Sequence, residues 1–328
     1  MTRTLRDATL IFGGSGFLGR HAVRAALAAA EARAKRSRRK AELVLSASRE
    51  PESALEGTVE GLYCVPFDVA GRGATEELLD DLAPKRVLLL TAMASIAHCD
   101  AYPGYARALN VEFPGRVARW TAANGARLVH VSTDLVFGAQ APPDGGFRET
   151  DAPAPMSNYG ALKLQGERAV TAADPHALVA RLPLCWDAHG RGCGAGEELL
   201  AAVERGARPK LFTDEWRTPL LVEDAAHALI ELAHARAEGL LHVAGPERIT
   251  RYDLGLSLLI ATGRAPADAR ARIAATTRKD EGLERSRPGD VCLDATRART
   301  ELGLALPGVS QALARITRSR KTSAEGAA

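Results

Sequence analysis

The sequence lacks the long apolar runs that mark membrane spans and cleaved leader sequences. No stretch among its 328 residues approaches the roughly 20 consecutive apolar residues that a membrane helix needs. The opening segment, MTRTLRDATLIFGGSGFLG, holds a short apolar run that breaks into glycines, and no small-residue cleavage site follows it. These absences predict a cytoplasmic protein that does not bind a membrane.

Cysteine is scarce and forms no pattern. The five cysteines are odd in number and contain no C-x-x-C pair, which argues against a disulfide framework and against a zinc site. They are Cys64, Cys99, Cys185, Cys193 and Cys292. Small buried thiols are therefore predicted. The eight histidines show no metal-ligand spacing either, so no metal site is predicted.

An excess of charge of one sign is also missing. The 43 basic and 40 acidic residues leave a formal net charge of only +3. A charge this small does not favour binding to nucleic acid. The one basic run, Lys35–Lys40, has no aromatic neighbours, so it predicts a solvated loop.

Short apolar runs alternate with longer amphipathic segments over the first two thirds of the chain. The predicted strands are Ala8–Phe12, Glu42–Ala47, Leu62–Pro66, Arg86–Thr91 and Arg127–Ser132. The predicted helices are Gly19–Ala34, Thr75–Leu82, Tyr105–Ala123 and, further on, Val222–His234. Because helices that connect neighbouring strands make those strands parallel, this alternation predicts an α/β fold with a doubly wound parallel sheet.

Three glycines, Gly13, Gly16 and Gly19, follow the first predicted strand and open the first helix. The first glycine permits a sharp turn, the second lets a pyrophosphate approach the backbone, and the third allows close packing of the helix on the sheet. The helix N-terminus then directs unpaired N–H groups at the phosphates. The motif predicts a Rossmann-type dinucleotide site that includes Ser15, Phe17 and Leu18.

The residues after the second predicted strand decide which dinucleotide is expected. NAD sites usually carry an acidic residue there, whereas NADP sites accommodate a 2′-phosphate with arginine. The sequence has Ser48 and Arg49 at this point and no carboxylate. It therefore favours NADP (NADPH), with the alternative that Arg49 only begins a surface loop.

A candidate catalytic group lies further along the chain. Tyr159 and Lys163 are spaced so that a helix places both on one face, where the ammonium would favour ionisation of the phenol. Such a pair can pass a proton to or from a substrate oxygen. Ser132 and Thr133 end a predicted strand, at the edge where open α/β sheets bind ligands.

These motifs together resemble the extended short-chain dehydrogenase/reductases, and most closely the dTDP-4-dehydrorhamnose reductase (RmlD-like) family. The resemblance rests on the glycine motif, Leu109-Asn110-Val111, Val131–Phe137 and Tyr159-x-x-x-Lys163. It continues through Arg217–Asp224, His242–Glu247 and Arg287–Asp294, so it spans nearly the whole chain in order.

The resemblance implies a role for each of these positions. Thr133 would polarise the substrate, Tyr159 would donate a proton, and Lys163 would bind the nicotinamide ribose. Further residues expected around the cofactor are Asp68, Val69, Thr91, Ala92, Met93, Asn110, Ser132 and Pro183. Arg217 and Arg287 match positions that meet the pyrophosphate of a nucleotide-sugar substrate. The alternative is that these two arginines are structural and bond to loop carbonyls.

The alternation of strands and helices becomes less regular after Arg181, which predicts two parts of the chain with different roles. We expect an NADP-binding domain over residues 1–181, with returns to its sheet around 211–244. Residues 182–210 and 245–316 would form a smaller C-terminal substrate-binding part. The polar, small residues 317–328 predict a flexible tail.

The predicted activity is reduction of a nucleotide-linked 4-keto-6-deoxy-sugar. The related sugar dehydratases carry Thr-Asp-Glu for elimination, whereas Leu135 follows Thr133-Asp134 here, which favours reduction. Asp134 would then be structural. Two alternatives remain open, a sugar-nucleotide epimerase and a non-catalytic NADP-binding subunit similar to the β-subunit of methionine adenosyltransferase. A homodimer is compatible with each of them.

Overall fold

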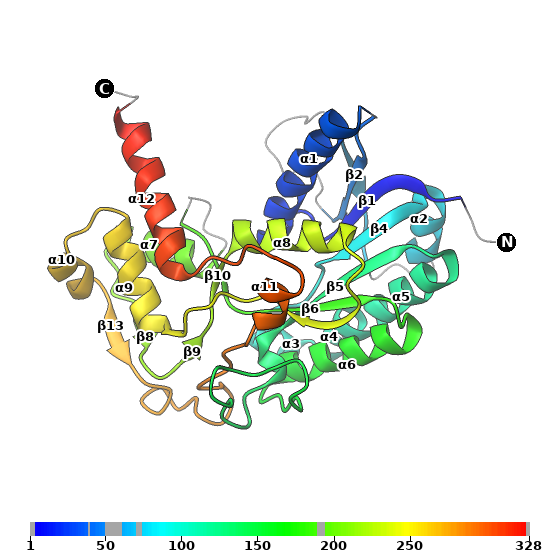
Figure 1. Cartoon of the computed structure of the whole chain (residues 1–328). Helices are drawn as coiled ribbons and strands as arrows, with labels where there is room; N and C mark the ends of the chain where they lie inside the picture. The colour runs from blue at the N-terminus through cyan, green and yellow to red at the C-terminus, as the bar shows by residue number, and fades with distance from the viewer. Residues whose placement is uncertain (1–3, 39, 50–60, 70–73, 189–193, 326–328) are drawn as a thin grey trace.

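A seven-stranded parallel sheet forms the centre of the chain (Figure 1). The computed structural model describes residues 4–38, 40–49, 61–69, 74–188 and 194–325, with side chains to residue 318. The strand order is β11-β6-β5-β4-β1-β2-β3. The strands are β1 (Arg6–Phe12), β2 (Leu43–Ser48), β3 (Leu62–Pro66), β4 (Pro84–Leu89), β5 (Arg127–Thr133), β6 (Leu178–Leu182) and β11 (Gly239–His242). The predicted α/β fold with a doubly wound parallel sheet is confirmed.

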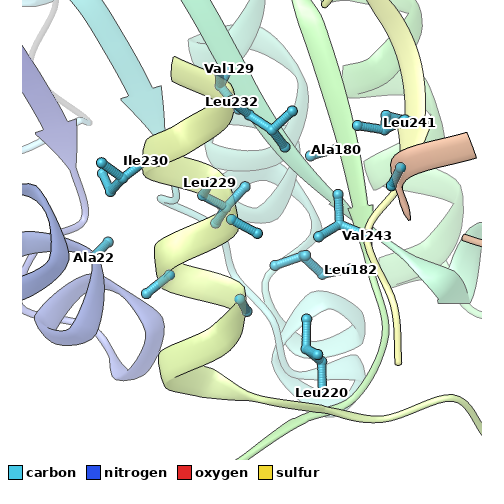
Figure 2. Close-up of a cluster of buried hydrophobic side chains, with 14 of the residues drawn as sticks. Ala22, Val129, Ala180, Leu182, Leu220, Leu229, Ile230, Leu232, Leu241 and Val243 are labelled. Atoms are coloured by element: carbon cyan, nitrogen blue, oxygen red, sulfur yellow. The ribbon is translucent and has the colours of Figure 1, made fainter. Parts of the chain in front are cut away.

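Helices cover both faces of this sheet, because successive strand residues point to opposite faces. One face packs against α1 (Phe17–Ser37) and α8 (Val222–His234), and the other against α2 (Ala74–Leu82), α5 (Phe113–Asn124) and α6 (Asn158–Ala173). In β1, Ile11 belongs to the first core and Leu10 to the second. Figure 2 shows α8 side chains such as Leu229 between Ala22 of α1 and Val129 of β5.

The C-terminal part lies on the side of Figure 1 away from the N-terminus and has a hydrophobic core of its own. Buried Trp186, Leu199, Leu258 and Ile316 belong to it. Its strands pair as β7 (Cys185–Trp186) with β10 (Leu220–Leu221), β9 (Trp216–Arg217) with β12 (Ile249–Thr250), and β8 (Lys210–Phe212) with β13 (Ala274–Thr276). Its helices are α7 (Ala195–Glu204), α9 (Arg251–Ala261), α10 (Pro266–Ala271) and α12 (Val309–Glu325), whereas α11 (Thr296–Thr300) packs against the first core beside β11.

Several local expectations are wrong. Helix α12 continues through residues 317–325, where the composition predicts a flexible tail. Its first turns dock through Val309 and Ile316, and no glycine or proline interrupts the chain before residue 326, so the helix propagates outward. The predicted loop at Lys35 lies within α1, and Cys64 is exposed because β3 is an edge strand. Cys193 lies outside the described residues.

The long predicted helix at 105–123 is also divided. It begins as α4 (Pro103–Arg107), passes through a π-helical turn at Ala108–Glu112 and continues as α5. A short helix, α3 (Ile96–Ala101), precedes it. Such π-turns are frequent at functional sites. Among the described residues, none of the helices combines the length and the hydrophobicity needed to cross a bilayer.

Candidate active site

The glycine turn between β1 and α1 has the close-packed geometry that the motif predicts. Gly13 has a φ of 87°, in the left-handed region that favours glycine. Its N–H donates to the Ala47 carbonyl across 2.9 Å, and Gly16 caps the start of α1. A Cβ on Gly19 would collide with the Gly13 carbonyl oxygen. The first turn of α1 therefore packs directly on the loop, with its free N–H groups facing outward from the sheet edge.

A cavity of about 240 Å³ opens beside this turn, at the carboxyl ends of β1, β2 and β4. Nine of the predicted cofactor residues line it, namely Gly13, Ser15, Gly16, Ser48, Arg49, Asp68, Val69, Thr91 and Ala92. Tyr105 of α4 and Leu109 of the π-helical turn also line it. Leu109 belongs to the motif that carries the family resemblance, whereas no pattern indicated Tyr105, because only the tertiary packing of α4 brings it to the sheet edge.

Where the cavity meets the carboxyl end of β2, it is lined by groups suited to the 2′-phosphate of NADP. The Ser48 hydroxyl is buried and has no hydrogen-bond partner among the described residues. Arg49 follows it and is exposed. The unpaired Ser48 hydroxyl and the exposed Arg49 side chain next to it are suited to hydrogen-bond with the oxygens of a bound phosphate.

The remaining predicted cofactor residues do not line this cavity. Phe17, Leu18 and Gly19 form the first turn of α1, and Pro183 follows β6. The Asn110 side chain accepts a hydrogen bond from the Met93 N–H (3.0 Å) and donates one to the Met93 carbonyl (3.2 Å). Asn110 thus fixes the chain that leaves β4.

The predicted catalytic residues come together at the carboxyl end of β5. Thr133 is the last residue of β5, and its hydroxyl hydrogen-bonds with Tyr159 and with Asp134, the latter at 3.1 Å. Tyr159 and Lys163 lie one turn apart on α6, and both are buried. The Lys163 ammonium donates to the Val131 carbonyl across 2.7 Å. The helix start that places Tyr159 here is capped by Ser157, whose hydroxyl accepts from the Gly160 N–H at 3.1 Å.

Burial sets the ionisation of this group. It raises the pKa of Tyr159, the nearby Asp134 raises it further, and the hydrogen bond with Thr133 offsets part of the rise. The pKa of Tyr159 therefore rises rather than falls, because burial outweighs the lowering that was expected from Lys163. Burial also lowers the pKa of Lys163 to about 8, against the opposing effect of Glu167. A neutral phenol that retains its proton is suited to donate it.

A buried ion pair lies directly beneath the catalytic residues. Glu167, one turn after Lys163, accepts two hydrogen bonds from Arg181, at 2.9 and 2.7 Å, and one from the Ser132 hydroxyl at 2.5 Å. Ser132 therefore turns away from the cavity, although the sequence predicts it to be a cofactor residue. The spacing of Glu167 from Lys163 could have indicated that Glu167 lies beside the catalytic residues, since both lie on one face of α6.

The two predicted substrate arginines lie near this group but already have partners. Arg217 is buried, with its Nε 3.7 Å from Asp134 Oδ2 and its Nη1 donating to the Trp216 carbonyl at 2.8 Å. Arg287 makes two hydrogen bonds to Glu215, a carboxylate that is fully buried. Burial raises the pKa of Asp134 to about 6, although Arg217 lowers it in part. No motif or spacing in the sequence indicated Glu215.

Comparison with known proteins finds relatives along most of the chain. The model of a family described as RmlD substrate binding domain matches residues 7–321. The probable low-salt glycan biosynthesis reductase Agl14 of Haloferax volcanii is 31% identical over 250 residues, which cover 75% of this chain and 81% of that protein. Methionine adenosyltransferase 2 subunit beta of Bos taurus is 30% identical over 197 residues, which cover 55% of this chain and 58% of that protein.

The fold is shared with a solved reductase structure. The dTDP-4-dehydrorhamnose reductase of Bacillus anthracis, solved in complex with NADP, superposes with a TM-score of 0.75. The match covers 96% of this chain and 100% of that chain at 18% identity. At that identity the similarity shows the fold alone.

Proposed function

The chain belongs to the RmlD substrate binding domain family, and on that premise we propose that it reduces the ketone of a nucleotide-linked 4-keto-6-deoxy-sugar. The observation that carries this proposal is the convergence of Thr133, Tyr159 and Lys163 at the end of β5. Strand β5 adjoins β4, whose carboxyl end helps to line the cavity beside the glycine turn. A proton donor and a dinucleotide site are thus adjacent.

Thr133, Tyr159 and Lys163 each have a separate role in the proposed reaction. The Thr133 hydroxyl would hold the substrate carbonyl oxygen, and Tyr159 would donate its proton to that oxygen as the carbon is reduced. NADPH, when bound, supplies the hydride. Lys163, held at the Val131 carbonyl, is placed to bind ribose hydroxyls and to offset negative charge that develops near the phenol.

We propose NADP rather than NAD as the cofactor, because Ser48 and Arg49 lie where the 2′-phosphate is expected. The glycine turn would hold the pyrophosphate, Asp68 and Val69 would lie at the adenine, and Thr91–Met93 and Pro183 would line the remainder. Residues 182–210 and 245–316 would form the substrate-binding part. Asn110 and Ser132 support this arrangement through the contacts described above.

The position after Asp134 supports reduction rather than elimination. Leu135 stands where the related dehydratases carry a glutamate, and it packs in an apolar cluster with Tyr159, Met93 and Ile96. A carboxylate is therefore missing from the place where an elimination acid would act. Proton donation by Tyr159 is sufficient for a ketone reduction.

The direct test is to incubate the protein with NADPH and a dTDP-4-keto-6-deoxy-sugar and to follow cofactor oxidation. Tyr159→Phe is expected to reduce kcat by about 10²–10⁴-fold because it removes the donated proton, while NADPH still binds. Tyr63→Phe, at an exposed position on β3, serves as the matched control. Bound cofactor with no turnover across a panel of keto-sugars would instead support a non-catalytic subunit. Product isomerisation without net NADPH oxidation would support an epimerase.

A further inference from the structure

The segment Phe67–Val69, which follows the edge strand β3, forms one wall of the cofactor cavity. All three of its residues line that cavity. The Phe67 N–H donates to the Ser48 carbonyl across 2.9 Å, which ties the beginning of the segment to β2. The proposed function places the adenine at Asp68 and Val69, so the position of this segment determines how closely the adenine ring can pack.

Helix α5 contacts this segment at two points. The ring of Phe113, the first residue of α5, has its centroid 6.1 Å from that of Phe67 and 5.1 Å from that of Phe12 at the end of β1. Three residues further along α5, Arg116 Nη2 donates a hydrogen bond to the Val69 carbonyl across 3.2 Å. The first contact is apolar and holds one end of the segment, whereas the second is polar and holds the other end.

Val69 lies between the cofactor cavity and a second hollow. This hollow has a volume of about 540 Å³ and is lined by Val69, by the small residues Gly115 and Ala169, and by Arg116 and Arg119. Val69 is partly buried and packs at the margin of the second core. Because a residue beside two cavities has fewer atoms around it than a core residue, dispersion contacts restrain it less. The hydrogen bond from Arg116 is therefore placed to fix Val69.

The π-helical turn that leads into α5 holds a neighbouring part of the same cavity. Asn110 pairs with both polar groups of the Met93 main chain, and Leu109 lines the cavity directly. The turn passes into α5 without a break. One continuous helical segment therefore holds the chain after β4 through Asn110 and the chain after β3 through Arg116.

The Arg116 side chain makes this attachment through one acceptor. Among the described residues, that acceptor is the Val69 carbonyl, and the buried Nε of Arg116 has no partner. A hydrogen bond with a charged donor is stronger than one between neutral groups. Without the Arg116 donors, the segment would keep the contacts of Phe67 but would lose its polar attachment to α5.

We propose that Arg116 is a positioning residue for the adenine half of the cofactor, because it holds the segment Phe67–Val69 against the cofactor cavity. This inference rests on the proposed function, since it requires a dinucleotide in that cavity. Arg116 does not line the cavity, so its effect on binding is exerted through Val69. It also lies outside the motifs that carry the family resemblance.

The test is a pair of calorimetric titrations of the whole protein, with adenosine 2′,5′-bisphosphate for the adenine half and nicotinamide mononucleotide for the other half. Arg116→Met removes the donors and keeps a long unbranched side chain. It should weaken binding of adenosine 2′,5′-bisphosphate about tenfold, as expected for the loss of a hydrogen bond with a charged donor, and leave binding of nicotinamide mononucleotide unchanged. Arg116→Lys, which retains a donor, should lie between the wild type and Arg116→Met.

Arg119→Met is the matched control, because Arg119 is exposed on the same helix and lines the same hollow. It should bind both compounds as the wild type does. Unchanged affinity of Arg116→Met for adenosine 2′,5′-bisphosphate overturns the inference, as does an equal loss for both compounds. If Arg116→Met does not fold, the same two comparisons on Arg116→Lys decide the matter.

The same experiment separates this inference from the proposed function. A wild type that binds neither adenosine 2′,5′-bisphosphate nor NADPH contradicts the proposed cofactor and this inference together. A selective loss in Arg116→Met, in a protein that reduces no keto-sugar, supports the role of Arg116 and contradicts the proposed reaction alone.

Discussion

The cofactor cavity and the arginine cluster, which consists of Arg217, Arg287 and their partner Glu215, are built in opposite ways. The cavity beside the glycine turn relies on main-chain N–H groups at the start of α1, and Arg49, the cationic side chain among the described residues that line it, is exposed. The arginine cluster relies on charged side chains gathered around Glu215, which is fully buried. The first site needs close backbone packing, and the second needs charge balance.

This difference predicts which substitutions each region tolerates. Backbone N–H groups are positioned by secondary structure, so the cavity is sensitive to added volume and insensitive to loss of a charge. Glu215 is fully buried and pairs with Arg217 and Arg287, so the cluster is sensitive to the loss of that one charge. Four substitutions test the contrast.

The largest effect is expected from Glu215→Gln. The substitution leaves Arg287 and Arg217 without the carboxylate that they share. Removal of one partner of a buried ion pair lowers the free energy of unfolding by about 3–5 kcal/mol. Urea denaturation measures this quantity. Glu284→Gln, at an exposed position in the same part of the chain, should change it by less than about 0.5 kcal/mol. A cost below 1 kcal/mol for Glu215→Gln would show that the cluster does not depend on its carboxylate.

Gly19→Ala tests the backbone packing of the cofactor cavity. The new Cβ would overlap the Gly13 carbonyl oxygen, so the turn must shift, at a cost of about 1–3 kcal/mol and with weaker NADPH binding. Gly104→Ala is the control, since a Cβ there meets nothing within 4 Å. Denaturation and fluorescence titration of NADPH give both quantities. Unchanged NADPH affinity in Gly19→Ala would contradict the assignment of the turn.

Asp134→Asn tests the carboxylate between the two regions through its pH dependence. The folded pKa of Asp134, about 6, exceeds the ordinary value of 3.8, so the native state binds more protons between these values. Its stabilising contribution is therefore present below pH 3.8 and is lost as the pH rises through 6. The variant should exceed the wild type by about 3 kcal/mol in unfolding free energy at pH 8, and the difference should disappear near pH 3. Exposed Asp81→Asn should show no such dependence, and a constant difference for Asp134→Asn would refute the assignment.

The smallest effect is expected from Arg49→Asp. Loss of a charge-assisted contact with the 2′-phosphate should weaken NADPH binding about tenfold and leave NADH binding nearly unchanged. Fluorescence titrations with both cofactors measure the ratio. Arg36→Asp, exposed on α1, is the control for a change of surface charge. An equal loss for both cofactors would mean that Arg49 does not distinguish them.

Local patterns were sufficient to predict the sheet and the family. The strands at the centre of the sheet are continuous apolar runs because parallel strands are buried on both faces. The predicted helix Val222–His234 agrees with α8 because its apolar spacing follows the helical period. The predicted resemblance to the RmlD-like family is confirmed by the match over residues 7–321.

The tail and the π-helical turn were not predictable from composition. The polar composition after Ile316 resembles that of a disordered segment, and only the docking of its first turns shows why α12 continues. The π-helical turn at Ala108–Glu112 has no distinct spacing in the sequence, and it holds Asn110 against the chain after β4.

The sequence by itself determined where the glycine turn, Thr133, Tyr159 and Lys163 would lie, because their positions follow from strand ends and from the spacing along one helix. Only the tertiary structure decided the partners of the charged residues. Glu215 directly precedes the two-residue strand β9, and it meets Arg287, 72 positions further along the chain, only after the small strands have packed. The ionisation of Tyr159 was decided in the same way, because burial is a property of the assembled core rather than of any local motif.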